Sequence, residues 1–124
     1  MSRTHRILVV DDESAVRSLI TAILAGSGYQ VDTAEDGAVA WEALQAISYD
    51  LLITDHNMPK KTGVELVKSL RSARMALPVV MVAGSLPMEE LAQNPSLELA
   101  ATILKPFGLD ELLDTVTTVL QMAE

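Results

Sequence analysis

The chain contains no cysteine, which excludes a disulfide framework, thiol catalysis and thiolate metal ligation. It also lacks a basic cluster, because nine Lys and Arg residues stand against 17 Asp and Glu residues and give a formal net charge of -8. A surface of that sign repels a nucleic-acid backbone and offers anionic lipid no electrostatic attraction. We therefore expect no direct binding to nucleic acid and no binding to membranes.

Long apolar runs are missing as well, since none of those present could span a bilayer. The first residues lack the basic segment and the long apolar segment of a signal peptide. Both observations favour a cytoplasmic location. The 124 residues are 49% hydrophobic and 21% charged, which is typical of one compact domain with a single core. We predict a single domain over residues 1–124, with its core at about 6–122 and no output domain.

Short apolar runs alternate with helical patterns along the whole chain. Strands are predicted at residues 7–10, 30–34, 51–53, 79–82 and 102–104. Several of these runs are unbroken, as in strands buried on both faces of a parallel sheet. Helices are predicted at residues 16–24, 37–47, 62–75, 88–93 and 109–120. Five βα units result, and they favour an open, doubly wound α/β fold with right-handed crossovers.

Two helices carry apolar stripes at helical spacing, and a third is interrupted. The stripes consist of Val16, Leu19, Ile20, Ile23 and Leu24 in the first helix and of Leu109, Leu112, Leu113, Val116 and Leu120 in the last. The fourth helix should stop at Asn94-Pro95, because proline lacks the amide donor and crowds the preceding turn. We predict a short helix there, followed by an irregular stretch before Leu97.

Charged residues follow three of the predicted strands. Asp11 and Asp12 come after the first strand, Asp55 after the third and Lys105 after the fifth. In a doubly wound sheet, ligands bind at the carboxyl ends of the strands, so these side chains should meet. Carboxylates are ligands that Mg²⁺ prefers, a carboxylate can attack phosphorus, and a lysine supplies a point charge for phosphoryl oxygens. The pattern indicates a Mg²⁺ site that accepts a phosphoryl group on Asp55.

Each residue taken alone has a simpler interpretation. Asp11 or Asp12 could cap the following helix, and Asp55 before a proline loop could be a turn residue. Lys105 could merely end a strand, and His56 is by default a loop histidine that faces solvent. The joint placement of the three aspartates and the lysine favours a functional site over these separate readings.

The chain resembles the receiver domains of response regulators in two-component signalling, from Ile7 through Leu120. The resemblance is carried by the segments Ile7-Leu8-Val9-Val10-Asp11-Asp12, Ala34-Glu35-Asp36-Gly37, Asp50-Leu51-Leu52-Ile53-Thr54-Asp55-His56-Asn57-Met58-Pro59, Gly63, Leu77-Pro78-Val79-Val80-Met81-Val82 and Lys105-Pro106-Phe107. It implies a flavodoxin-like fold, a five-stranded parallel sheet of order 2-1-3-4-5 with (βα)5 connectivity.

The same resemblance implies roles for individual residues. Asp55 would accept the phosphoryl group from a sensor histidine kinase or a histidine phosphotransfer protein, and Lys105 would contact that group. Asp11, Asp12, Asp55 and the backbone carbonyl of Asn57 would hold Mg²⁺. The backbone amide of Gly84 would approach a phosphoryl oxygen, since no Cβ crowds it. The bond between Lys105 and Pro106 is often cis in this family, at the small cost that X-Pro bonds allow.

Two positions depart from the family pattern. Ala83 stands where the family usually has Thr or Ser, and an alanine cannot donate a hydrogen bond. Thr102 stands at the switch position, three residues before the lysine, where Tyr or Phe is usual. Ser85 could replace the missing hydroxyl only if its loop turned inward. We hypothesise that phosphorylation of Asp55 produces a weak or altered conformational change.

Three functions are compatible with these patterns. The leading one is a stand-alone phospho-acceptor receiver, not an enzyme beyond its own phosphorylation and dephosphorylation, that signals through protein contact. The second is a pseudo-receiver, an interaction domain largely independent of phosphate. The third is a phosphatase or flavin-binding protein of similar topology, which is disfavoured because Asn57 replaces a second acid and no glycine-rich phosphate loop is present. Pairing of two copies through the C-terminal helix stays open.

Overall fold

Five parallel strands form one sheet in the computed structural model, which describes residues 4–123. The strands are β1 (Arg6–Val10), β2 (Gln30–Ala34), β3 (Leu51–Thr54), β4 (Val79–Ala83) and β5 (Ala101–Leu104). Their order across the sheet is β2-β1-β3-β4-β5, with every neighbouring pair parallel. This arrangement confirms the doubly wound, flavodoxin-like fold and the strand order that the sequence predicted.

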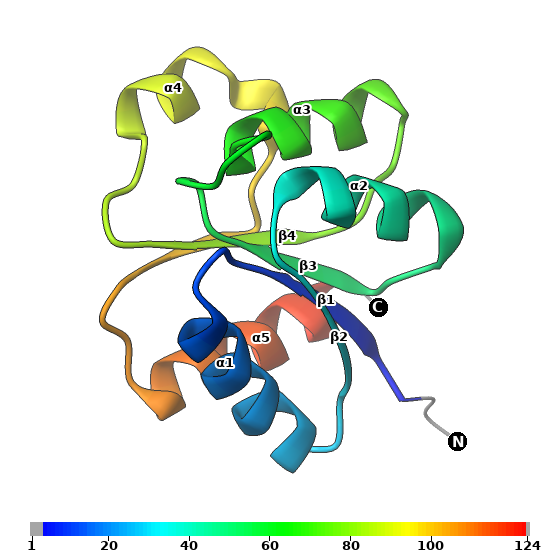
Figure 1. Ribbon diagram of the computed structural model, residues 1–124, viewed down its shortest axis with the longest axis vertical. Helices are drawn as coiled ribbons and strands as arrows, with labels where there is room; N and C mark the ends of the chain where they lie inside the picture. Colours follow the sequence, from blue (N-terminus) through cyan, green and yellow to red (C-terminus); the bar gives the residue numbers. More distant parts are fainter. Residues whose placement is uncertain (1–3, 124) are drawn as a thin grey trace.

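Helices cover both faces of the sheet. They are α1 (Ser14–Gly26), α2 (Gly37–Ala46), α3 (Gly63–Ser72), α4 (Met88–Gln93) and α5 (Leu109–Met122), with a 3₁₀ turn η1 (Pro95–Leu97) after α4. Figure 1 shows α1 and α5 together on one side of the sheet and α2, α3 and α4 on the other. The central strands are therefore buried on both faces, which explains their unbroken apolar sequences.

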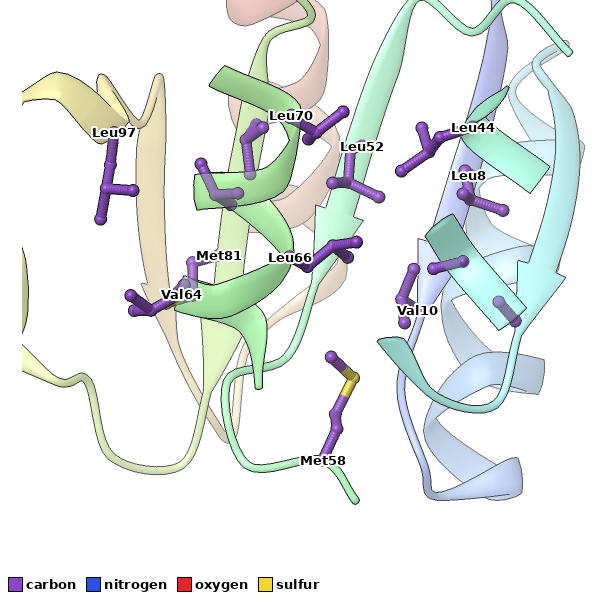
Figure 2. Close-up of a cluster of buried hydrophobic side chains, with 14 residues drawn as sticks. Leu8, Val10, Leu44, Leu52, Met58, Val64, Leu66, Leu70, Met81 and Leu97 are labelled. Atoms are coloured by element: carbon purple, nitrogen blue, oxygen red, sulfur yellow. The ribbon is translucent and has the colours of Figure 1, made fainter. Parts of the chain in front are cut away.

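The core has two halves, one on each face of the sheet. Leu8, Leu52 and Met81 point toward α2 and α3, where they pack against Leu44 and Leu66 (Figure 2). Alternate residues of the same strands pack on the opposite face against α1 and α5. This second set includes Ile7, Val9, Ile53, Val80, Val82, Ile20, Leu24, Leu112 and Val116. The apolar face of α5 is thus occupied by the core.

Strand register brings the carboxyl ends of the strands to one edge of the sheet. Val10, near the end of β1, lies opposite both Ala34 of β2 and Thr54 of β3. Ala83 at the end of β4 lies opposite Leu104 of β5. Residues that directly follow these positions leave the sheet at the same edge. The fold therefore gathers the segments that the sequence singled out for function.

Helix boundaries differ from the prediction in a few places. Leu19 is 52% exposed and Leu109 is 54% exposed, so neither belongs to the buried face assigned to it from spacing. The third helix ends at Ser72 rather than Met75, because the chain turns there through Arg74, which has a positive φ. The break after α4 is confirmed, although the stretch expected to be irregular contains the 3₁₀ turn with Leu97 inside it.

Within residues 4–123, no helix combines the length and the apolar character needed to cross a membrane.

Candidate functional site

The site lies where β1, β3, β4 and β5 end. Asp11 directly follows β1, Asp55 follows β3, and Lys105 follows β5, while Ala83 is the last residue of β4. The Asp55 amide donates to the Val10 carbonyl at 3.0 Å, and the Lys105 amide donates to the Ala83 carbonyl at 2.9 Å. These bonds continue the sheet by one residue and bring the functional side chains together at a rigid edge.

Three carboxylates form the acidic centre of this site. Asp11, Asp12 and Asp55 each offer an oxygen, and these oxygens all lie within 4.8 Å of one another. Asp11 and Asp55 are buried, at 2% and 6% exposure, whereas Asp12 is open to solvent. Hard oxygen donors around a point that water can reach are what Mg²⁺ requires, because it retains several of its waters. The residues therefore fit the metal that the sequence suggested.

Lys105 is the cation that the structure places beside this acidic centre. Its Nζ lies 2.8 Å from Asp11 Oδ2, 3.3 Å from Asp55 Oδ2 and 3.8 Å from Glu13 Oε1. The Lys105–Pro106 peptide bond is cis, as the resemblance implied. The structure thus places the Lys105 ammonium beside Asp11 and Asp55. Glu13 is an additional acid nearby that sequence reasoning missed.

Burial and charge shift the pKa values in this cluster. Burial raises the pKa of the Asp55 carboxyl above its usual value; the Lys105 ammonium opposes that rise and the neighbouring Asp11 adds to it. Burial lowers the pKa of Lys105, but the hydrogen bond to Asp11 and the charge of Asp55 outweigh it, so the net pKa is raised. Lys105 therefore stays charged, whereas the surroundings of Asp55 disfavour its ionised form.

Asp11 is oriented by the start of α1 rather than serving as its cap. The Asp11 carboxylate accepts a hydrogen bond from the Glu13 amide at 2.9 Å, and Arg17 Nη1 donates to the Asp11 carbonyl at 2.6 Å. The N-cap of α1 is Glu13, whose side chain makes no capping bond. The helix-cap alternative for Asp11 and Asp12 is therefore wrong, and both remain available as ligands.

The loop after Asp55 folds tightly against its own strand end. The Asp55 carboxylate accepts from the His56 amide at 2.7 Å, and the His56 carbonyl accepts from the Met58 and Gly63 amides. A Cβ on Gly63 would lie 2.3 Å from the Asp55 carbonyl oxygen, so only glycine fits there. Asn57 is exposed in this loop, two residues beyond Asp55.

The start of α2 holds the far side of the same loop. Asp36 caps α2 by accepting from the Val39 amide at 2.9 Å, and this bond lowers the pKa of the Asp36 carboxyl. Lys60 Nζ lies 3.6 Å from the Asp36 carboxylate. A Cβ on Gly37 would lie 2.5 Å from the Lys61 carbonyl oxygen, so the loop and the helix start approach very closely. The matching segment around Asp36 and Gly37 therefore supports the loop that carries Asn57.

The fourth strand ends without a hydroxyl group. Ala83 is fully buried, whereas Gly84 and Ser85 are exposed. A Cβ on Gly84 would meet nothing within 4 Å, so the space beside its amide is open. Thr102 is exposed on β5 and lines a hollow of about 190 Å³ with Leu91 of α4 and other residues. At the two positions that depart from the family pattern, the chain thus has a buried alanine and an exposed threonine.

His56 is the residue that sequence reasoning placed wrongly. It was expected to face solvent, but it is only 9% exposed and its Nδ1 accepts from the Val64 amide at 3.4 Å. The turn between Asp55 and Gly63 carries the His56 ring inward against the start of α3. A loop has no periodicity that would reveal this direction. Arg17 was missed for another reason, because its contact with Asp11 is made to the backbone.

Comparisons with known proteins agree with this geometry. The family described as "Response regulator receiver domain" matches residues 7–117. The regulatory protein PhoP of Bacillus subtilis, which controls alkaline phosphatase synthesis, is 36% identical over 121 residues, covering 96% of this chain and 50% of the relative. The DltR regulator of Streptococcus agalactiae is 35% identical over 108 residues, covering 87% and 48%. The chain thus spans about half the length of the curated relatives it matches.

Solved structures give the same result. The chemotaxis response regulator CheY4 of Vibrio cholerae matches with a TM-score of 0.85 and 32% identity, covering 94% of this chain and 99% of that one. TrrA of Thermotoga maritima, solved in complex with Mg²⁺ and BeF, matches with a TM-score of 0.84 and 30% identity, covering 94% and 99%.

The fold and the acidic edge define a signalling domain of the two-component type rather than a conventional enzyme. The chain belongs to the response regulator receiver domain family. Receiver domains are the phospho-acceptor modules of these systems and take phosphoryl groups from histidine kinases. The prediction of a stand-alone domain stays a prediction.

Proposed function

We propose that this domain accepts a phosphoryl group on Asp55 from a histidine kinase or a histidine phosphotransfer protein and passes the signal on by protein contact in the cytoplasm. The observation that carries this proposal is the convergence of Asp11, Asp12, Asp55 and Lys105 at one edge of the sheet. The donor would be a phosphohistidine and the downstream partner a protein.

The transfer step follows from the residues present. A carboxylate oxygen of Asp55 attacks phosphorus, the new O–P bond forms, and the N–P bond of the donor breaks with its electron pair returning to the imidazole nitrogen. Lys105, 3.3 Å from Asp55 Oδ2, neutralises charge on the phosphoryl oxygens. The Gly84 amide, with open space beside it, donates to one of those oxygens.

The acidic cluster would hold Mg²⁺ through the carboxylates of Asp11, Asp12 and Asp55 and the backbone carbonyl of Asn57. When bound, the ion supplies positive charge that offsets the repulsion among these carboxylates and toward the incoming phosphoryl group. Asp11 is already oriented for this role by Glu13 and Arg17.

The pseudo-receiver alternative has less support. Ala83 and Thr102 favour it, because the usual hydroxyl and the usual aromatic ring are both replaced. An interaction domain independent of phosphate would not need Asp11 and Asp55 buried beside Lys105. Burial of ionised Asp55 lowers the stability of the fold, because it raises the pKa of that carboxyl. The complete acidic set therefore supports a working acceptor.

The test is intact mass after incubation with acetyl phosphate, with and without Mg²⁺, for the native chain and for Asp55→Asn. We expect a Mg²⁺-dependent phosphoryl adduct on the native chain and none on the variant, which lacks the attacking oxygen. Asp114→Asn, an exposed change on α5, is the matched control and should label like the native chain. No adduct from either acetyl phosphate or a kinase donor would support the pseudo-receiver instead.

A further inference from the structure

α4 is attached to the domain more loosely than the other helices. None of its residues, Met88–Gln93, is buried, whereas α3 buries five. The small side chain of Thr102 leaves a hollow of about 190 Å³ between β5, Leu91 of α4 and Leu97 of η1. An aromatic ring at residue 102 would fill such space and brace α4 against the sheet. In this chain α4 lacks such a ring, although Leu91 packs against the core.

His56 reaches α4 from the acceptor loop. It directly follows Asp55, and its backbone amide donates to Asp55 Oδ1 at 2.7 Å. Its Nε2 is 3.6 Å from Glu90 Oε1 on α4. α4 lies on the same side of the sheet as α3 (Figure 1). One residue therefore contacts the acceptor carboxylate through its backbone and α4 through its side chain.

The hydrogen bonding of the ring fixes which atom faces Glu90. Nδ1 accepts from the Val64 amide at 3.4 Å, so Nδ1 carries no proton and the ring proton is on Nε2. That N–H points to the Glu90 carboxylate, which lies a few tenths of an ångström beyond hydrogen-bond distance. A small displacement of either partner makes or breaks the bond. Glu90 is exposed, so its side chain is free to follow such a displacement.

We propose that His56 is a positioning residue that links the state of Asp55 to α4 through Glu90. The inference rests on the proposed function, since it requires that Asp55 becomes loaded. Attachment of a phosphoryl group to one oxygen of Asp55 converts the carboxylate into an acyl phosphate, so the hydrogen bond from the His56 amide to Asp55 changes. The ring moves with its backbone, and Glu90 transmits the movement to α4. This route needs neither a hydroxyl at Ala83 nor an aromatic ring at Thr102.

The test is amide hydrogen exchange of α4, read by mass spectrometry, before and after loading with beryllofluoride and Mg²⁺. In the native chain, loading should change the α4 exchange rates by about threefold or more. Glu90→Ala should lose that response. Glu90→Gln should keep it, because the amide oxygen still accepts from Nε2–H. Glu89→Ala is the matched control, as it removes a neighbouring exposed carboxylate from the same helical turn and should respond like the native chain.

A double-mutant cycle distinguishes the contact between His56 and Glu90 from a general destabilisation of α4. His56→Phe and Glu90→Ala should each abolish the α4 response, and the double variant should show no further effect. Intact mass with acetyl phosphate runs in parallel. If the native chain forms no adduct, the proposed function and this inference fail together. If the adduct forms and Glu90→Ala still responds like Glu89→Ala, the inference alone is overturned.

Discussion

Asp55 occupies a place that is unfavourable for a carboxylate at neutral pH. Burial raises the pKa of the Asp55 carboxyl; Lys105 offsets part of the shift, and Asp11 adds to it. The folded state therefore binds the Asp55 proton more tightly than the unfolded chain does. Ionised Asp55 therefore lowers the free energy of unfolding, so the acidic site reduces the stability of the domain.

We predict that Asp55→Asn raises the free energy of unfolding at pH 7, because asparagine keeps the shape of the side chain and removes its charge. The gain should shrink as the pH falls through the raised pKa of Asp55 and vanish well below 3.8, where the carboxyl is protonated in both states. Urea unfolding at several pH values measures this. Asp114→Asn should change little, and a gain independent of pH would contradict the explanation.

Tyr49 offers a second titration at the other end of the sheet. Burial and the 2.7 Å hydrogen bond to Asp32 raise the pKa of Tyr49 from 10.0 to about 12, against the opposing charge of Arg6. In a Tyr29→Phe background, tyrosinate absorbance should therefore show a midpoint of about 12. The unfolded chain ionises first, so stability should fall as the pH rises from 10.0 toward 12. Asp32→Asn should bring the midpoint back toward 10.0.

Residue identities at the site were predictable because strand ends are visible in sequence. Asp11, Asp12, Asp55 and Lys105 each follow an apolar run, and parallel strands bring such positions to one edge. His56 was not predictable. Its direction depends on the turn that Gly63 closes against the Asp55 carbonyl, and that turn is a property of the folded loop.

At the scale of elements, the loop between β3 and α3 packs tightly against the end of β3. Gly63→Ala would place a Cβ 2.3 Å from the Asp55 carbonyl oxygen, and backbone on both sides leaves little scope for relief. We predict a loss of about 2 kcal/mol in the free energy of unfolding, together with weaker phosphoryl acceptance, because Asp55 itself must shift.

A glycine in open space provides the control. Nothing lies within 4 Å of a Cβ built on Gly26 in α1. Gly26→Ala should therefore stabilise the fold by about 0.5 kcal/mol, through the smaller entropy of the unfolded chain. Thermal and urea unfolding of both variants measure the contrast. Equal effects at the two positions would show that contact with the acceptor loop is not the cause.

The helices and strands were predictable from the spacing of apolar residues and from the position of proline. The Asn94-Pro95 pair predicted the short α4, and the helix does end at Gln93. The exposure of Leu19 and Leu109 was missed, because helical spacing shows which residues share a face and not how far the core extends over it. Tertiary packing decided those two positions.

At the scale of the whole molecule, the acidic edge links metal binding to stability. A ligand that binds only the folded state at tenfold its Kd adds about 1.4 kcal/mol to the free energy of unfolding. We predict that Mg²⁺ raises the Tm of the native chain and that Asp12→Ala abolishes this rise without lowering the Tm in its absence, since Asp12 is exposed and adds repulsion. NaCl at equal ionic strength is the control for screening. An equal rise with NaCl would exclude a specific ion site.

The strand order also determines when the molecule can fold during its synthesis. β1 lies between β2 and β3, and its first residue, Arg6, bonds to Asp50, 44 residues further along the chain. The ribosome adds about 5–20 residues per second, so β1 spends seconds with β2 as its sole available neighbour in the sheet. The acceptor pocket cannot assemble until the last strand delivers Lys105. A nascent chain therefore cannot form the complete acidic site before β5 and Lys105 have been synthesised.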